Sequence, residues 1–420
     1  MRDLSRALAE RLDAADPLAE FRSSFELPDP GLIYLDGNSL GRMPAATPGR
    51  LNDVLRREWA DRLIRSWNES WFDLPSRVGD LIGEHFLGAA PGQVVVADST
   101  TVNFYKLVAA AAGARPDRRR IITDRGNFPT DRYVVEGVAA ARGLTATLAE
   151  FDEIDGPAPS AVAACVDRDV ALVTLSLVDY RSGALADMAA INEVVHAAGA
   201  LVLWDLSHAA GAVPIELDGT GTDLAVGCTY KYLNGGPGAP AFLYVRSGLV
   251  GELLPPIWGW YGQRDQFAMG QGFAPVPGTG RFLSGTPHVL GAIGAEEGAR
   301  LLAEAGIGRL RDKSVRLTEL AIELADAWLA PHGLTLASPR DAARRGSHIS
   351  LAHSDGYRIC RALIELAGVV PDFRQPDRIR LGFAPAYTRY TDVWDGMDRL
   401  RAIVAGGAHL TIDLPDLPVT

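Results

Sequence analysis

Short apolar runs without polar alternation recur along the middle of this 420-residue chain and constrain its fold more than any other feature. They predict strands at 93–97, 121–123, 170–178, 200–204 and 241–245. Strands that are apolar on both faces are typical of parallel sheets covered by helices on both sides. The alternation of such strands with helical segments, one of them predicted at 186–198 and ended by Gly199, predicts an open α/β sheet. Ligands of such sheets bind at the carboxyl ends of the strands.

The pattern changes after about residue 288. Two long helical patterns, at about 288–306 and 309–333, are followed by short strands predicted at 334–338, 347–352 and 378–383. Helices and strands grouped in blocks are typical of an α+β domain. We therefore expect a large α/β domain that ends at about 287 and a smaller α+β domain at 288–420.

Composition excludes several classes of function. Lysine and arginine number 41 against 52 aspartate and glutamate residues, and the net charge of −11 disfavours binding to nucleic acid or to an anionic membrane. Three cysteines are too few and too scattered for a disulfide framework or a four-ligand zinc site, so we expect no metal. No apolar run is long enough to span a membrane, and the first 25 residues lack the apolar core of a signal peptide. A cytoplasmic enzyme is the expected class.

Lys231 is the only charged residue between positions 224 and 245. Burial lowers the pKa of a lysine and leaves an amine that can form a Schiff base or act as a base. A lysine at a strand end with its ammonium in water is an equally good interpretation of this window alone.

Asp205 directly follows the strand predicted at 200–204, and His208 follows three residues later. A strand-end carboxylate and a later lysine are the pair that pyridoxal 5′-phosphate (PLP) requires. The carboxylate keeps the pyridine nitrogen protonated, and the lysine holds the aldehyde. Without Lys231, a helix-capping aspartate and a core histidine would be a serious alternative.

Two further segments suit the same cofactor. Ser99, Thr100 and Thr101 stand between a strand and a helix, where hydroxyl and N–H groups form an anion site, although helix capping explains any one of them. Phe128 could stack on a planar ring and Asp131 could bond a ring substituent, although the segment alone would be a turn and a helix cap.

With these pieces in order, the chain resembles the kynureninase family of fold-type-I PLP enzymes, in the aspartate aminotransferase superfamily. The resemblance extends over nearly the whole length and includes ten blocks in the family's order. They are YLDGNSLG (34–41), RSWNESW (65–71), FPTD (128–131), YRSG (180–183), WDLSHAAGAVP (204–214), CTYKYLNGGPG (228–238), GWYG (259–262), RFLSGT (281–286), RGSHIS (345–350) and IRLGFAP (379–385).

The resemblance implies a mostly parallel seven-stranded sheet in a large domain at 51–287, a small domain at 288–420, and an N-terminal segment at 1–50 near the active site. It implies a homodimer whose active sites are shared across the interface. It also implies that the cofactor is bound by Ser99, Thr100, Phe128, Asp131, Asp205, His208, Tyr230, Lys231, Trp260 and Thr286. Of these residues, Trp260 and Thr286 would reach across the dimer interface to the cofactor phosphate bound by the partner. Lys231, Tyr230, Asp205 and His208 would be the catalytic residues.

The implied reaction is hydrolytic cleavage of the Cβ–Cγ bond of L-kynurenine, or of a ring-substituted kynurenine such as 3-hydroxykynurenine, to an anthranilate and L-alanine. The implied substrate residues are Arg380, which would pair with the α-carboxylate, and Asn38, Ser39 and Gln263.

Three positions depart from the family pattern. Gln263 stands where the family usually has histidine, Asp179 stands in place of asparagine, and Pro287-His288 replaces Gln-Pro. Glutamine cannot become cationic, and His288 is a candidate substitute for the lost imidazole. These positions are expected near the aryl pocket, so an altered aryl ketone is an alternative substrate.

Other functions stay open. A different PLP lyase or an aminotransferase that acts on another amino acid is the main alternative, and a non-catalytic PLP-binding regulator is a remote one. A desulfurase needs a reactive cysteine on a mobile loop, which none of Cys165, Cys228 and Cys360 suits. A dehydrogenase is disfavoured because no G-x-G-x-x-G motif follows the first strand.

Overall fold

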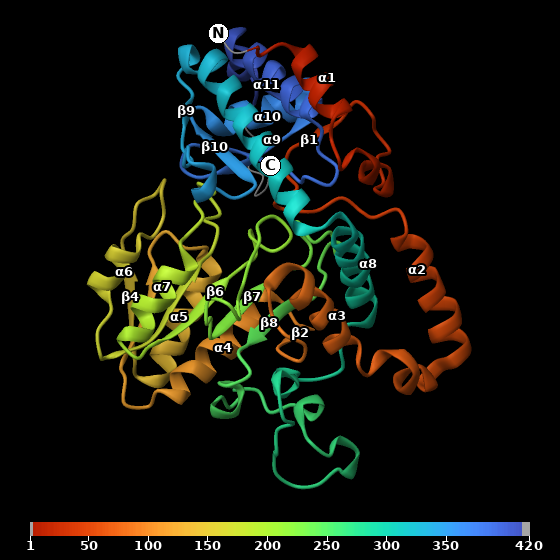
Figure 1. Ribbon diagram of the computed structural model, residues 1–420, viewed down its shortest axis with the longest axis vertical. Helices are drawn as coiled ribbons and strands as arrows, with labels where there is room; N and C mark the ends of the chain where they lie inside the picture. Colours follow the sequence, from red (N-terminus) through yellow and green to blue (C-terminus); the bar gives the residue numbers. More distant parts are fainter. Residues whose placement is uncertain (1–2, 414–420) are drawn as a thin grey trace.

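The computed structural model describes residues 3–413, and its largest element is a sheet at the centre of the molecule (Figure 1). In this part of the chain the sheet has seven strands in the order β2-β8-β7-β6-β5-β3-β4. Their bounds are β2 Val94–Ala97, β3 Arg120–Asp124, β4 Thr145–Ala149, β5 Val170–Ser176, β6 Leu201–Asp205, β7 Leu224–Gly227 and β8 Ala241–Val245. All neighbours are parallel except β8, which runs antiparallel to β7 and to β2. The predicted mostly parallel sheet is confirmed.

Burial on both faces explains the uninterrupted apolar runs. In β6, Val202 and Trp204 belong to one hydrophobic core, whereas Leu201 and Leu203 belong to another core on the opposite face. Helices supply the other half of each core. Those that flank the sheet are α3 Leu74–Ile82, α4 Thr100–Ala114, α5 Pro129–Arg142, α6 Pro159–Cys165 and α7 Met188–Ala197. Gly199 has a φ of 73°, as expected for a glycine just after the end of α7.

A second layer of helices and strands lies above the large sheet in Figure 1. Among the described residues it has a four-stranded antiparallel sheet in the order β12-β13-β10-β9. Its strands are β9 Thr335–Leu336, β10 His348–Ala352, β12 Asp372–Arg374 and β13 Arg378–Gly382, and its helices are α9 Ile307–Trp328, α10 Gly356–Ala367 and α11 Tyr390–Ala405. This grouping confirms the α+β class predicted for the C-terminal part of the chain. The last seven residues of that part, 414–420, lie outside the described residues.

The helix α8 (Val289–Ala305) connects the two layers, but its buried face belongs to the lower one. Ile293, Ala295 and Leu302 lie in the hydrophobic core that covers one face of the large sheet, together with residues of α3. The core of the upper layer includes α9 residues from Leu317 onward.

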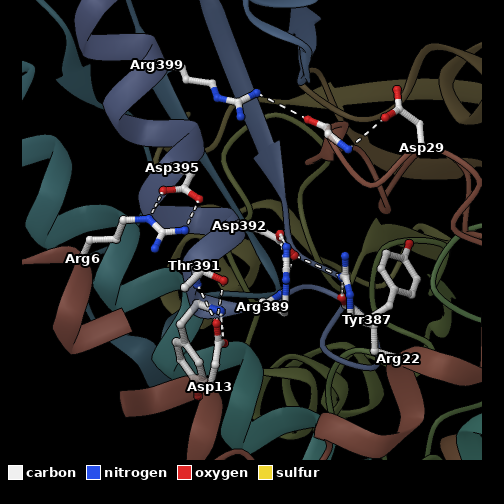
Figure 2. Close-up of polar contacts among 12 residues, drawn as sticks. Arg6, Asp13, Arg22, Asp29, Tyr387, Arg389, Thr391, Asp392, Asp395 and Arg399 are labelled. Carbon is white, nitrogen blue, oxygen red and sulfur yellow. Dashed lines mark hydrogen bonds and ion pairs between the residues drawn. The ribbon is translucent and has the colours of Figure 1, made fainter. Parts of the chain in front are cut away.

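The N-terminal segment is attached to the upper layer. Two of its elements, α1 Arg6–Ala14 and β1 Ile33–Tyr34, contact α11, and β1 pairs in parallel with β11 (Val369–Val370). The helix that follows, α2 Thr47–Asp53, packs against α8 instead. Figure 2 shows the Asp13 carboxylate against the start of α11, where it accepts hydrogen bonds from Tyr390 N (2.6 Å) and Thr391 Oγ1 (2.6 Å). Arg6 Nε lies 2.7 Å from Asp395 Oδ1 in the same view. These contacts fix where the chain between 15 and 46 crosses the molecule.

A long segment between β8 and α8 projects from the lower edge of the molecule in Figure 1, away from the upper layer. This projecting loop, residues 254–288, contains three short 3₁₀ turns, at Trp260–Gly262, Gln266–Ala268 and Thr279–Phe282. Across residues 3–413, no helix combines the length and the apolar character needed to cross a membrane.

Candidate active site

A cavity of about 330 Å³ opens at the carboxyl ends of β2, β5 and β6. This is the edge at which parallel α/β sheets bind their ligands. Its lining includes eight of the residues predicted from the sequence: Ser99, Thr100, Phe128, Asp131, Asp205, His208, Tyr230 and Lys231. The structure therefore brings most of the predicted cofactor residues together.

Lys231 lies in the turn after β7, and its Nζ is 2.9 Å from His208 Nε2. Burial lowers the pKa of Lys231, and burial followed by the charge of Lys231 lowers the pKa of His208 well below its usual value. His208 is therefore a neutral imidazole near pH 7.

Two carboxylates face each other across the floor of the cavity. Asp205 is the last residue of β6, and its Oδ1 accepts a hydrogen bond of 2.7 Å from Ser207 N. Asp131, in the first turn of α5, is buried. Burial and then the Asp205 carboxylate raise the pKa of Asp131 well above its usual value. A cationic group placed near the two carboxylates would therefore be favoured.

The anion-binding end is the turn from β2 into α4. Ser99 caps α4 by accepting a hydrogen bond from Val102 N through its side chain. Thr100 is the first helical residue, and both line the cavity. A 15-residue helix presents free N–H groups and the positive end of its dipole at this point.

Aromatic side chains form the walls. Phe128 and Tyr180 meet edge to face, with ring centroids 5.3 Å apart, and both line the cavity. Tyr230 also lines it, and the adjoining Cys228 thiol followed by burial raises the pKa of the Tyr230 phenol. Tyr230 is therefore protonated throughout the neutral range and can donate a proton.

Arg380 occupies a buried cluster beside the cavity. Its Nη1 donates to the carbonyl of Tyr180 (2.6 Å), and its Nη2 donates to Ser39 Oγ (2.7 Å) and pairs with Asp372. Oriented to suit its neighbours, the Asn38 amide accepts from Arg380 Nε (2.9 Å). The three predicted substrate residues Arg380, Asn38 and Ser39 thus form one network, which shares Tyr180 with the cavity wall.

The N-terminal motif reaches this network because it passes directly over the lysine turn. Gly41 N donates to the carbonyl of Tyr230 (2.8 Å), and Asn234 Nδ2 donates to the carbonyl of Arg42 (2.8 Å). A Cβ on Gly41 would lie 2.3 Å from the Lys231 carbonyl oxygen, so only glycine permits this approach.

Trp260, Thr286 and Gln263 lie on the projecting loop, and none of them lines the cavity of its own chain. Trp260 and Thr286 are exposed. Gln263 Oε1 accepts a hydrogen bond of 2.7 Å from Ala274 N and so stabilises the loop itself. Asp179, expected near the aryl pocket, instead accepts from Arg181 N, Ser182 N and Ser182 Oγ in a turn that lines a different cavity.

Two further histidines, His288 and His348, lie in or beside the site. His288 lines the cavity, and its Nδ1 caps α8 by accepting from Gly291 N (3.1 Å). His348, on β10, is fully buried with its ring centroid 5.4 Å from that of His208. The RGSHIS motif was the only sequence signal for His348, and it gave no role.

The unpaired polar atoms of the cavity test whether it suits PLP. Within residues 3–413, Asp131 Oδ2 and His208 Nδ1 are buried and have no hydrogen-bond partner. Together with the Lys231 amine, a strand-end carboxylate and a helix N-terminus, they match an aldehyde, a pyridinium ring with polar substituents and a phosphate. The donor set fits the cofactor.

Comparisons of the sequence with known proteins agree with this geometry. The kynureninase C-terminal domain family matches residues 310–400. A kynureninase from Pseudomonas fluorescens is 44% identical over 398 residues, which are 94% of each chain. A kynureninase from Burkholderia pseudomallei strain 1106a is 43% identical over 409 residues, which are 96% of each chain.

Solved structures share the fold at lower identity. A cysteine desulfurase from Thermococcus onnurineus NA1 superposes with a TM-score of 0.80 at 17% identity, over 92% of this chain and 98% of that one. A C-DES variant with glycine linked covalently to its PLP cofactor gives 0.76 at 18%, over 90% and 99%. The fold is therefore that of the fold-type-I PLP enzymes. The identity and coverage of the two kynureninases go further and show that this chain belongs to the kynureninase family.

Proposed function

We propose that this chain hydrolyses the Cβ–Cγ bond of L-kynurenine, or of a ring-substituted kynurenine such as 3-hydroxykynurenine, to give an anthranilate and L-alanine, with PLP as its cofactor. The single observation that carries the proposal is the partly buried Lys231 amine, hydrogen-bonded to His208 in the cavity that Asp205 also lines. Membership of the kynureninase family supports the substrate class.

Eight lining residues of the cavity would hold PLP. Lys231 would bind the aldehyde, Asp205 the pyridine nitrogen, and Phe128 one face of the ring. Asp131 and His208 would contact its polar edge, and the phosphate would bind to Ser99, Thr100 and Tyr230. When bound, PLP withdraws electrons from the substrate's α-carbon and so stabilises negative charge there and at the β-carbon.

The protein supplies proton transfer. The lowered pKa of Lys231 would make Nζ, when it is not bound to the cofactor, a base that accepts the substrate's α-proton. Water then adds to the γ-carbonyl, and the Cβ–Cγ bond breaks to give the aryl acid. Tyr230 precedes Lys231 and keeps its phenolic proton, so it can donate that proton as the alanyl product forms.

Arg380, Ser39 and Asn38 would orient the substrate. A guanidinium binds a carboxylate through two parallel hydrogen bonds, and Arg380 lies fully buried, next to Tyr180 of the cavity wall. Asp372 pairs with Arg380 in this structure, so the substrate α-carboxylate would bind to the Nη1 side or displace part of that pairing.

A homodimer with shared active sites is part of the proposal. The projecting loop exposes several large apolar side chains, among them Trp258 (61%), Phe267 (72%) and Met269 (81%). Large apolar side chains exposed together on one loop favour a surface that another protein covers. With the loop in contact with a second copy, Trp260 and Thr286 would reach the partner's phosphate site, and Gln263 the partner's substrate.

The division of the chain is also proposed here. The sequence predicts an N-terminal segment at 1–50, a large domain at 51–287 and a small domain at 288–420, but the packing of α8 favours a later end for the large domain. Because α8 packs in the core of the large sheet and α9 joins the upper core from Leu317, we propose that the boundary between the two domains lies within the first half of α9.

A different aryl ketone, cleaved by the same chemistry, is the second candidate. The observation in its favour is His288, which stands in the cavity and departs from the family pattern. An aminotransferase acting on another amino acid is the further alternative, and a non-catalytic PLP-binding regulator is a remote one.

The test is an absorbance scan of purified, PLP-loaded protein with and without L-kynurenine and 3-hydroxykynurenine, followed by product analysis. We expect a visible band from lysine-bound cofactor, absent in Lys231→Ala, and formation of an aryl acid and alanine in equal amounts. A band without either product favours another substrate. Conversion of the cofactor to its amine form with a keto acid would show an aminotransferase. Failure to bind PLP would overturn the proposal.

A further inference from the structure

A buried lysine outside the catalytic group holds the anion-binding turn. Lys106 lies on α4, two turns beyond Ser99, and its side chain has no exposed surface. Its Nζ donates to Asp98 Oδ2 (2.5 Å) and to the carbonyl of Phe282 (2.7 Å). Lysine is almost never fully buried unless it is paired, because removing its charge from water is costly.

Asp98 is the residue that shapes the turn. It precedes the helix cap Ser99, lines the cavity, and has a φ of 47°, in the left-handed region that non-glycine residues seldom adopt. Its carbonyl accepts a hydrogen bond from Ala241 N (2.8 Å), which continues the pairing of β2 with β8. The side chain, turned back toward Lys106, is thus the contact that favours this conformation over the ordinary ones.

The positive charge of Lys106 also affects the electrostatics of the anion site. An unpaired Asp98 carboxylate at the cavity edge would repel a phosphate group bound at Ser99 and Thr100. The ammonium of Lys106 compensates that charge. Through Phe282, it also ties the turn to the end of the 3₁₀ segment Thr279–Phe282, from which the chain runs to Thr286.

We propose that Lys106 is a positioning residue for the cofactor phosphate: its bonds to Asp98 and Phe282 hold the turn at 98–100 in its anion-binding conformation, and its charge compensates the Asp98 carboxylate beside the anion site. It touches neither substrate nor cofactor. This inference rests on the proposed function only in requiring that PLP binds in the cavity.

The test compares the binding of PLP with that of pyridoxal, which lacks only the phosphate. The ratio of the two dissociation constants isolates the phosphate contribution. We expect Lys106→Met to lower the preference for PLP by about tenfold, because a strained turn is released and a charge is left uncompensated, while pyridoxal affinity stays unchanged. The ratio requires no catalytic activity.

Lys313→Met is the matched control. Lys313 is likewise buried and pairs with Asp16 (Nζ to Oδ2 2.6 Å), but it lies outside the cavity lining. Its loss should lower the thermal stability and leave the binding ratio unchanged. Asp98→Asn combined with Lys106→Met should regain most of the preference, because asparagine tolerates a positive φ and carries no charge.

The outcomes separate this inference from the proposed function. Wild-type protein that binds neither PLP nor pyridoxal would overturn the proposed function. A wild type that prefers PLP, together with a Lys106→Met variant that keeps the same preference, would overturn the role of Lys106 alone. If Lys106→Met does not fold, the double variant Asp98→Asn/Lys106→Met tests the role of Lys106 instead. A normal PLP preference there supports the charge argument, and a preference lost despite restored neutrality contradicts it.

Discussion

Lys231 Nζ lies 2.9 Å from His208 Nε2 at the carboxyl ends of the strands, with His208 buried and Lys231 partly buried. Burial lowers the pKa of the amine, so the neutral, nucleophilic form is present at lower pH than in a free lysine. This relationship makes Lys231 ready to react with an aldehyde.

The first prediction is the pH dependence of PLP attachment. Because only the neutral amine attacks the aldehyde, the rate of attachment to cofactor-free protein should rise with pH and level off below the usual lysine pKa. The rate is measured by the growth of the visible band, with a lysine derivative in solution as reference. A rate that rises over the same pH range as the reference would contradict a lowered pKa.

The second prediction concerns Arg380. Arg380→Lys keeps the charge opposite Asp372 but loses the planar fork, so the KM for the amino-acid substrate should rise by about tenfold to a hundredfold. The absorbance of bound PLP should stay unchanged. Arg378→Lys, on the same strand but paired with Asp377, is the control. Equal KM values for wild type and Arg380→Lys would remove Arg380 from the substrate site.

The third prediction concerns His288. The hydrogen bond from Gly291 N occupies Nδ1, so the neutral ring carries its proton on Nε2. His288→Asn keeps a good helix cap and removes the imidazole. We expect the KM for the aryl ketone to rise by about fivefold to tenfold, as on losing one hydrogen bond, with little change in Tm. A lower Tm at constant KM would assign His288 to the helix cap alone.

The fourth prediction tests the shared active site. Lys231→Ala and Trp260→Ala should each be nearly inactive as pure proteins. In a mixed dimer, one of the two cavities regains both an intact lysine and an intact partner tryptophan. Random reassortment should therefore restore about one quarter of wild-type activity. Activity that stays at the level of the separate variants after subunit exchange would show that Trp260 serves no neighbouring cavity.

Much of this architecture was predictable because local signals and burial agree. The buried runs at β5, β6 and β8 and the strand-end position of Asp205 follow from apolar continuity alone. The edge strand β4 was missed because Thr145–Ala149 is partly exposed and mixes threonine with alanine. Edge strands lack the two-sided burial that marks the central ones.

The parts of the site that could not be predicted from the sequence depend on contacts between residues far apart in the chain. Nothing near Arg380 in the chain indicates that Ser39, 341 positions away, would accept its hydrogen bond. Lys106 resembles a surface lysine in a helical run until Asp98 and Phe282 are seen around it. Asp179 was expected at the aryl pocket from a family pattern, whereas its carboxylate is engaged by the turn that it begins.

Hydrolysis of a carbon–carbon bond is tested most directly by the source of the new carboxylate oxygen in the aryl product. PLP-loaded protein is incubated with L-kynurenine in water enriched in oxygen-18, and the anthranilate is analysed by mass spectrometry. The account predicts one heavy oxygen in each anthranilate and an equal amount of L-alanine. Kynurenine consumed without labelled anthranilate, or converted to a keto acid, would contradict it.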